Sequence, residues 1–486
     1  MSRIDINRPF DVFGEFWVSG QDDKTARGRM YRDESGIRIQ LFDDLRPGPS
    51  HVPVPGSENS SWEVVESPDI DVPLTIHGRL GGMVGTVTAF ECLTMRSSVV
   101  MFGGGPQEYV LMPLSVLVGG HIGDRSHTYT GVRVKLHHLD EWATLPGFAF
   151  EFSRDPAKIN ISYDEPTVET VELASGATLT ISQHVTFPAV TTSGGSINRT
   201  VQIRIAQLDN LTWQEISRSI LRPLESLLTL CLGVQCKVSG VELTDDGQHW
   251  MQLTGGWLSA DPVDAKVERP FVALHDIGLS AVAGWLDKVE QFGPLPPVVA
   301  RFSAKQQTVH LETELLEMTT AAEGLHARLF PEVVRMNAET TERVRDAIIE
   351  AVSAEEQNVR DIIQGVCSFL DAPGYPMRLK QLAGLVDDCA PEITGKTNRW
   401  ARHVTEARNS YAHRTKGFLS EDEIDVLATV TESLRWLLRS ILLLEAGVSK
   451  KHLAERLGES SAYLFFRKRA KESLPKVYDE QEDSLK

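Results

Sequence analysis

The hydrophobic periodicity of this chain changes once along its length. Before about Ala206, apolar and polar residues alternate in short runs such as 36–41, 131–136 and 178–185, which Gly, Pro, Asn and Asp separate. After Pro270, apolar residues recur every three or four positions. Alternation is typical of antiparallel β-sheet, and the longer period is typical of amphipathic helices. The chain is therefore predicted to be an α+β multidomain protein, with a β-rich antiparallel N-terminal domain followed by an all-α domain.

The N-terminal domain is expected to be a sandwich or distorted barrel with an inserted helix. Thr212 and Glu215 have the spacing of a capping box, in which each side chain satisfies a backbone amide at the start of a helix. An amphipathic run follows over 216–232, where Pro223 is expected to kink the helix. Strand-like alternation then resumes until about Leu258, and the domain boundary is expected between Ala260 and Pro270. We place this β-rich domain at 1–265.

The all-α domain is expected at 271–448 as a bundle. One apolar stripe is formed at four- and three-residue steps by Leu311, Leu315, Met318, Ala322, Leu325 and Leu329. Further helices are predicted around 341–353, 355–370, 377–388 and 397–412, and a last long helix from a capping box at Ser420 to a stop at Gly447. Short connections predict antiparallel packing of neighbouring helices. Residues 449–486 are expected to be a charged C-terminal tail.

Composition limits the class of protein further. A length of 486 residues makes two domains the default, and shares of 41% hydrophobic and 24% charged residues are those of a globular protein. The five cysteines are scattered without a CxxC pair, which favours buried thiols in a reducing cytoplasm. The most apolar stretch, 436–444, is short and contains Arg439, so no membrane span is expected. We expect a cytoplasmic protein with no leader peptide, no cofactor and no metal.

Charge is unevenly distributed along the chain. The formal net charge of −18 argues against a general nucleic-acid coat, because phosphate contacts need cations. Within 396–416, however, Glu406 is the one acidic residue among six cations, which are Lys396, Arg399, Arg402, Arg408, Arg414 and Lys416. This pattern suits a protein that engages a polyanion at one place, and a solvated helix face would look the same.

Arg408, Asn409 and His413 in this segment carry groups suited to cleaving RNA through its own 2′-hydroxyl. That reaction needs a base, an acid and positive charge on the phosphorane. An imidazole with a pKa of about 6.5 can serve as base or acid, and a guanidinium can hold two phosphate oxygens. The amide of Asn409 can donate to phosphate or fix the imidazole. This chemistry calls for no metal.

Helical geometry limits how Arg408 and His413 can meet. On a continuous helix of about 3.6 residues per turn, the two side chains would point roughly 140° apart. For the pair to act together, the helix must end or loosen near Tyr411 and Ala412. Alternatively, His413 faces a two-fold partner, so that two motifs line one cleft.

Several other residues are candidates near this motif. Glu323 flanks the apolar stripe of its own helix, so it could orient Arg408 or His413, or lie in solvent as a flank. Tyr411 falls on the packing stripe of its helix, although its hydroxyl could reach the edge of the site, and His403 is a rival acid or base. The residues expected to contact RNA are Arg399, Arg402, His403, Tyr411, Arg414 and Lys416.

The Arg-x4-His spacing, with Asn directly after Arg, resembles the signature of HEPN-domain ribonucleases, and the resemblance extends over most of the chain. Four segments are similar to the N-terminal domain of ApeA-type defence proteins, namely 13–17, 28–31, 118–121 and 139–142. In the helical part, 315–325 with Glu323 is similar to the first HEPN helix. Membership of this family implies a β-rich ApeA domain joined to an ApeA-like HEPN domain.

The resemblance implies an anti-phage, abortive-infection role, in which an HEPN homodimer or higher oligomer cuts RNA. Arg408, His413, Asn409 and Glu323 would form the catalytic set, and a phage-derived trigger would act through the β-rich domain. The RNA target is left open among tRNA, mRNA and ribosomal RNA, and no membrane partner is implied. The alternative is a non-catalytic module that binds RNA or protein, or dimerises, beside a β domain that senses a ligand.

Overall fold

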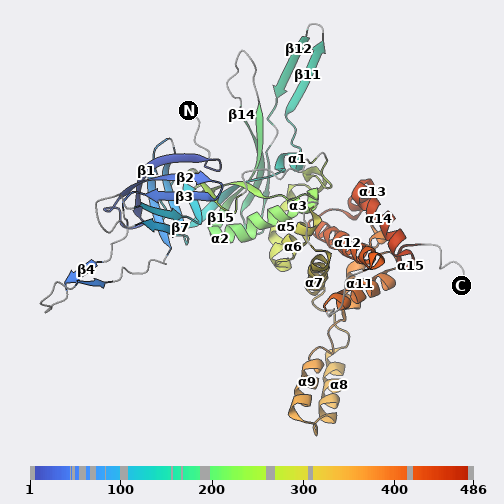
Figure 1. Ribbon diagram of the computed structural model, residues 1–486. Coiled ribbons are helices and arrows are strands. Elements are labelled where there is room, and N and C mark those ends of the chain that lie inside the picture. Colours follow the sequence, from blue (N-terminus) through green and yellow to red (C-terminus); the bar gives the residue numbers. More distant parts are fainter. Residues whose placement is uncertain are drawn as a thin grey trace. The chain divides into compact units, whose positions relative to one another are not determined.

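The structure is a computed structural model (Figure 1). It divides into two units, which we call the β unit (Met1–Glu225 and Cys236–Glu268) and the helical unit (Ser226–Gln235 and Arg269–Lys486). The residues that it describes are 6–43, 45, 50–53, 62–65, 73–82, 84–98, 108–154, 157–165, 168–186, 197–258, 267, 269–304, 310–412 and 420–479.

Antiparallel strands make up most of the β unit. The strands of its large sheet are β1 (Phe10–Val18), β2 (Ala26–Asp33), β3 (Gly36–Leu41), β6 (Leu74–Leu80), β7 (Gly85–Ser98), β8 (Glu108–Met112), β9 (Ser115–Val118), β10 (Thr128–Leu136), β13 (Glu169–Glu172), β14 (Thr178–Thr186), β15 (Asn198–Thr212), β16 (Val238–Thr244) and β17 (Met251–Gly255). Their order among the described residues is β13-β14-β15-β10-β16-β17-β9-β7-β6-β1-β2-β3-β8. Two further pairs are β4 (Ser50–Pro53) with β5 (Trp62–Val65), and β11 (Phe148–Arg154) with β12 (Ala157–Tyr163).

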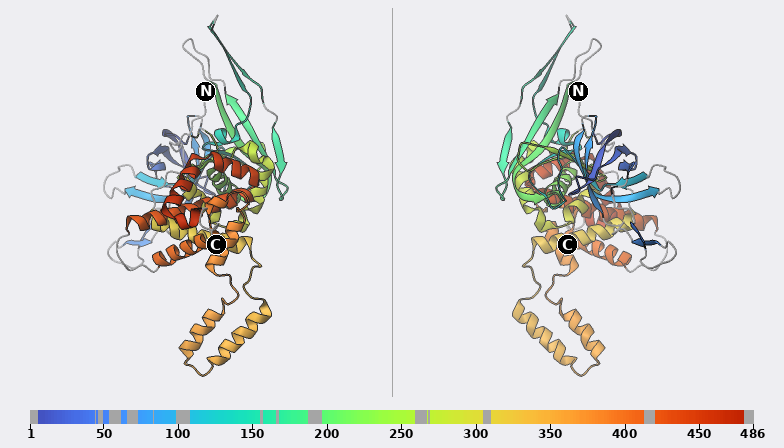
Figure 2. Two further views of the ribbon diagram at one scale, coloured as in Figure 1. Left: turned by 90° about the vertical axis from the view of Figure 1, so that its right-hand side faces the viewer. Right: turned by 90° about the vertical axis from the view of Figure 1, so that its left-hand side faces the viewer.

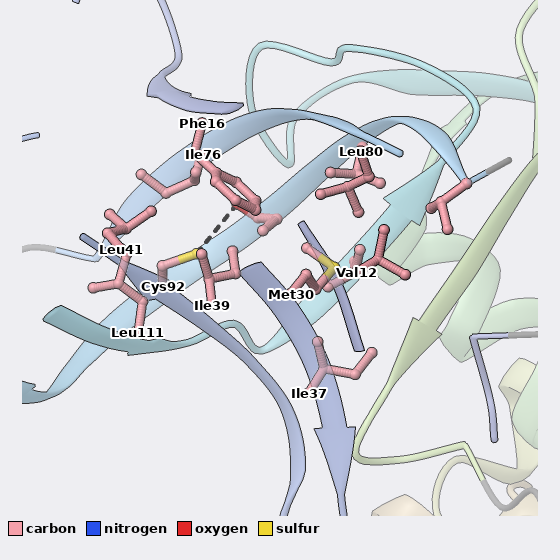
Figure 3. Close-up of a cluster of buried hydrophobic side chains, with 14 of the residues drawn as sticks. Val12, Phe16, Met30, Ile37, Ile39, Leu41, Ile76, Leu80, Cys92 and Leu111 are labelled. Carbon is pink, nitrogen blue, oxygen red and sulfur yellow. Dashed lines mark hydrogen bonds between the residues drawn. The ribbon is translucent and has the colours of Figure 1, made fainter. Parts of the chain in front are cut away.

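Part of the large sheet closes into a barrel, because β8 pairs with β7 as well as with β3. Side chains from β1, β2, β3, β6 and β7 fill its interior. Figure 3 shows Phe16, Ile39 and Ile76 near the thiol of Cys92, and Met30 beside Val12 in the same cluster. Burial raises the pKa of that thiol, so it stays protonated and behaves as a small apolar group. The predicted β-rich fold is confirmed, in its barrel-like form.

The inserted helical segment begins at the predicted capping box. It consists of α2 (Trp213–Ile216), a π-helical turn η1 (Ser217–Leu221) and α3 (Arg222–Leu232), and a shorter helix, α1 (Leu139–Ala143), precedes β11. Glu215 and Thr212 exchange the reciprocal bonds of the box, with Thr212 N donating to Glu215 Oε2 at 2.8 Å. The π turn comes directly before Pro223, and in it Arg222 N donates to Ser217 O, five residues back. The chain thus absorbs the proline with a wider turn.

Helices form nearly all of the helical unit. They are α4 (Leu274–Ile277), α5 (Leu279–Phe292), α6 (Leu295–Ser303), α7 (Leu311–Leu329), α8 (Ala338–Ala351), α9 (Gln357–Cys367), α10 (Tyr375–Gly384), the 3₁₀ turn η2 (Pro391–Ile393), α11 (Thr397–Ala412), α12 (Glu421–Glu445), α13 (Lys450–Glu459), α14 (Ser461–Ser473) and α15 (Pro475–Tyr478). The predicted stripe of α7 faces inward, since Leu315, Met318, Ala322 and Leu325 are buried. The all-α character predicted after Pro270 is confirmed.

Helix α12 is the centre of the helical unit and packs on α6, α7, α11 and α14. Its capping box at Ser420 is present, and Gly447 follows its end at a φ of +96°, which favours glycine. The guanidinium of Arg439 is buried in the core, where Nε and Nη2 both donate to Leu230 O at 2.9 and 2.6 Å. Burial lowers the pKa of Arg439 to about 10, so it remains charged at neutral pH. Residues 226–235 therefore complete this core.

The hairpin of α8 and α9 differs from the prediction that all helices pack in one bundle. Figures 1 and 2 show it projecting from the rest of the helical unit. Its outer apolar side chains, Ile349, Ile362 and Val366, are exposed. The non-helical stretches on both sides, 330–337 and 368–374, allow the hairpin to stand away. The two helices pack against each other, as their short connection predicts, but they stand apart from the bundle that was expected to include them.

The C-terminal segment, expected to be a charged tail, contains three described helices, α13, α14 and α15. Leu453, Leu457, Phe466 and Val477 from these helices are buried in the helical unit. None of the helices in the described ranges has both the length and the hydropathy that crossing a membrane requires.

Candidate functional site

Helix α11 presents Arg408 at the edge of its buried face. Trp400 and Val404 anchor that face at 0% exposure, and the indole Nε1 of Trp400 donates to Ser433 Oγ of α12 at 2.8 Å. Arg408 follows Val404 by four residues, so it lies on a neighbouring line of the helix, where about one third of its side chain is exposed. The helix therefore offers one partly exposed cation at the edge of its buried face.

Glu323 of α7 meets this cation. Its Oε2 accepts from Arg408 Nη2 at 2.8 Å, and its Oε1 lies 3.3 Å from Arg378 Nη1 of α10. The sequence allowed two positions for Glu323, inward toward the motif or outward in solvent, and the structure has the inward one. One carboxylate thus bridges two guanidinium groups from two other helices.

Tyr375, the first residue of α10, supports the same guanidinium from another side. The Arg408 Cζ atom lies 4.4 Å from the centroid of the Tyr375 ring, which is a cation–π distance. The phenol donates to Thr319 O of α7 at 3.3 Å, and burial raises its pKa, so it stays neutral. Arg378 is itself fixed, because its Nε donates to Pro373 O at 2.8 Å. Arg408 is therefore oriented by an ion pair and an aromatic face together.

The seam between α7 and α10 also contains a buried histidine. His326 is 1% exposed, and its Nε2 lies 2.7 Å from Gln381 Oε1, so this nitrogen carries the proton. Its ring stacks on Phe330. Burial lowers the pKa of His326, and the nearby Arg378 lowers it further. A neutral imidazole in this place holds the two helices that supply Glu323 and Tyr375.

Arg399, Arg402 and His403 of α11 do not share a face with Arg408. Arg399 lies nine residues earlier, roughly 180° around the helix, and its Nη1 donates to Lys476 O at 2.7 Å. Arg402 is exposed and lies 3.5 Å from Glu406, whose other oxygen is 3.9 Å from His403 Nδ1. Burial lowers the pKa of His403, and the charge of Glu406 partly opposes this. The basic segment is thus divided among several faces.

Asn409 is exposed beside Arg408, as a residue that meets a substrate should be. Helix α11 runs to Ala412 and includes Tyr411, whose side chain lies outside the described part. His413, Arg414 and Lys416 also lie outside the described residues. The expectation that the helix ends or loosens near Ala412 concerns residues 413–419, which lie outside the described part of the chain, so it stays a prediction together with the meeting of Arg408 and His413.

Arg378 and Tyr375 were not predicted from the sequence. They lie three residues apart, so they occupy one side of the first turn of α10. The signal available was the Tyr-x2-Arg spacing at a helix start, but we placed that start at 377, beyond the tyrosine. Together with Glu323 they hold a guanidinium with a defined direction. A guanidinium has five N–H donors, so an ion pair through one nitrogen leaves it able to bind phosphate.

Comparison with known families matches both parts of this architecture. A model described as ApeA N-terminal domain 1 matches residues 11–253, and a model described as Apea-like HEPN matches residues 316–452. The second match contains Glu323, Tyr375, Arg378 and Arg408. No curated protein and no solved structure matches the chain.

The β-rich barrel followed by a helical HEPN domain defines a two-domain protein that contains HEPN, a class whose members act on RNA. The first match spans half of the chain, so the chain belongs to the ApeA family. Its two domains together support a defence protein that contains HEPN.

Proposed function

We propose that this chain is a metal-independent endoribonuclease of an anti-phage, abortive-infection system. Arg408 contacts the scissile phosphate and His413 acts as acid or base. The single observation that carries the proposal is the orientation of Arg408, which Glu323 holds at 2.8 Å over the Tyr375 ring within the region that matches Apea-like HEPN. The ion pair and the ring fix the direction of the guanidinium, and about one third of the Arg408 side chain stays exposed, which leaves donors that can contact phosphate.

The reaction proceeds by attack of the 2′-oxygen on the adjacent phosphorus. The bond from that oxygen to phosphorus forms as the bond to the 5′-oxygen breaks, which leaves a 2′,3′-cyclic phosphate and a 5′-hydroxyl. His413 takes the proton of the 2′-hydroxyl or gives one to the leaving 5′-oxygen, and in the dimer the His413 of the second copy carries out the other transfer. Arg408 stabilises the charge on the phosphorane, and Asn409 donates to a phosphate oxygen. Glu323 acts through Arg408, so we class it as a positioning residue.

Assembly and control follow from the same proposal. In a dimer, a second copy of the chain would bring two motifs, each with its own His413, into one cleft. The β unit holds the nuclease quiet until a phage-derived trigger arrives. Deletion of 1–265 is a poor test of this control, because it also removes residues 226–235, whose Leu230 carbonyl accepts both bonds from buried Arg439.

The experiment that tests the proposal maps RNA 5′ ends in cells that express the full chain, with and without phage. His413→Ala and Arg408→Ala should abolish new ends. His310→Ala and Arg360→Ala serve as matched controls, since both residues are exposed in the same unit and lie away from the motif. The controls should keep the wild-type pattern.

Two results would change the assignment. If the wild type and all four variants give the same RNA ends, infected or not, the result supports the non-catalytic alternative, in which the chain binds RNA or protein without cleaving it. If the controls lose cleavage as completely as the motif variants, the defect lies in folding, and thermal unfolding of each variant will show it. The target class, whether tRNA, mRNA or ribosomal RNA, is read from the same map.

A further inference from the structure

A basic cluster surrounds a cavity of about 290 Å³ in the helical unit. The cavity lies among the η2–α11 junction, α14 and α15, and its lining includes Lys396, Arg467 and Lys471. Lys476 and Arg399 extend the cluster, since Arg399 Nη1 donates to the backbone oxygen of Lys476 at 2.7 Å. These five cations face two acidic residues, Glu392 and Asp479, which also line the cavity. A local excess of positive charge in a chain of net charge −18 needs an explanation.

The walls of this cavity are rigidly joined. Lys396 N donates to Val477 O at 2.9 Å, and Tyr478 Oη donates to Ile393 O at 3.1 Å. Gly395, at a φ of +54°, lies so close that a Cβ atom there would be 2.5 Å from Val477 O. Helix α15 is therefore fixed against the start of α11. A preformed site loses less entropy when a ligand binds.

The charges of the cluster are only partly neutralised inside the protein. Arg467 pairs with Glu392 at 3.0 Å, and the side chains of Lys471 and Lys476 are exposed. Along α14, Lys468 and Lys471 follow Phe465 at three-residue steps on exposed positions, so Lys468 adjoins the cluster, and Phe465 and Lys468 also line a second pocket with Asp422, Asp425 and Glu472. An exposed aromatic ring beside cations is the equipment with which proteins hold single-stranded nucleic acid, by base stacking and phosphate contact.

We propose that the cluster formed by the start of α11 with α14 and α15 is a binding site for the RNA backbone. The inference rests on the proposed function and adds to it a surface that anchors the substrate. Arg399 points away from Arg408 by roughly half a turn. The cluster therefore holds RNA at a distance from the cleaved phosphate, and its loss weakens binding without changing the chemical step.

The test uses the full chain with His413→Ala, so that the RNA probe stays intact. Lys468→Gln, Lys471→Gln and Lys476→Gln are combined, and the control combines Lys288→Gln, Arg343→Gln and Lys451→Gln. All six residues are exposed in the helical unit, and both triples change the net charge equally. Fluorescence anisotropy measures binding of a labelled single-stranded RNA over a range of salt concentrations.

The binding constant for RNA falls as salt rises, and the loss of three phosphate contacts should make the slope of log K against log salt less steep by about 2. Binding near 0.1 M salt should weaken about 100-fold. The control triple should bind like its parent. In the cleavage-competent chain, the cluster triple should raise KM and leave kcat unchanged. If the triple variant of the cluster does not fold, Lys471→Gln alone should still make this slope less steep, by about 0.7.

Equal losses in both triples would overturn the proposal, because net charge alone would then explain them. Unchanged RNA binding would overturn it as well. If the cluster triple instead lost binding only to vesicles that contain phosphatidylserine, the cluster would belong to a membrane contact. The anisotropy result does not depend on cleavage, so a chain that binds through the cluster but never cuts RNA would refute the proposed nuclease and leave this inference standing.

Discussion

Glu323→Gln is the most informative single substitution in the helical unit. Glu323 bridges Arg408 and Arg378 at 2.8 and 3.3 Å through its two oxygens. A glutamine keeps the shape but has one oxygen and one NH₂ group, so it can accept from only one of the two guanidiniums. The NH₂ group then faces the second guanidinium, which is itself a donor. That guanidinium loses its partner and can turn away.

The expected cost in stability is small. About one third of each side chain in the Glu323–Arg408 pair is exposed, and pairs of this kind contribute about 0.2–1 kcal/mol each. We therefore expect the free energy of unfolding to fall by about 1 kcal/mol. The effect on cleavage should be much larger, because a displacement of about 1 Å at a catalytic group can cost roughly 100-fold in rate. We expect kcat to fall about 10- to 100-fold with little change in KM.

A matched control lies on the same helix. Glu317 pairs with Arg301 at 3.8 Å, with a similar exposed fraction, so Glu317→Gln should change stability equally and leave kcat unchanged. Cleavage of a labelled RNA under single-turnover conditions and urea unfolding of both variants provide the two readouts. Wild-type kcat in Glu323→Gln, or equal loss in both variants, would refute the positioning role.

Three further predictions follow from the same contacts. Tyr375→Leu removes the ring under Arg408 and should lower kcat, whereas Tyr375→Phe keeps the ring and should retain most of it; single-turnover rates compare the two. The folded-state pKa of His326 lies below its unfolded value, so the unfolded chain binds more protons and stability should fall as pH drops below about 6.5; urea titrations should show a smaller fall in His326→Gln. Trp400→Phe loses the 2.8 Å bond to Ser433 in the core and leaves a cavity, so it should cost about 2 kcal/mol in urea unfolding; an unchanged free energy of unfolding would contradict this.

Local patterns in the sequence predicted much of the architecture. The β-rich part was located from the alternation before Ala206, and the helical part from the three- and four-residue period after Pro270. Each period arises because a strand or a helix buries one of its faces. The capping boxes at Thr212 and Ser420 are both present, since such a box depends on four residues alone. These features depend on neighbours along the chain.

Features that depend on distant residues were harder to predict. The closure of the barrel by β7 and β8 could not be read from strand patterns, because pairing joins segments far apart. The role of residues 226–235 in the helical unit was missed for the same reason, since only the fold brings Leu230 to Arg439. Arg408 was found from its motif, but Tyr375, which supports it, had no motif of its own.

The measurement that tests the central claim most directly is the chemistry of the RNA ends that the purified full chain produces in EDTA. Attack by the 2′-oxygen must leave a 5′-hydroxyl and a 2′,3′-cyclic phosphate, and a single 2′-deoxy substitution at the cleaved nucleotide must block the cut. The account predicts this result for the wild type and no cleavage for His413→Ala. Cleavage that leaves a 5′-phosphate, or that persists in His413→Ala, would contradict it.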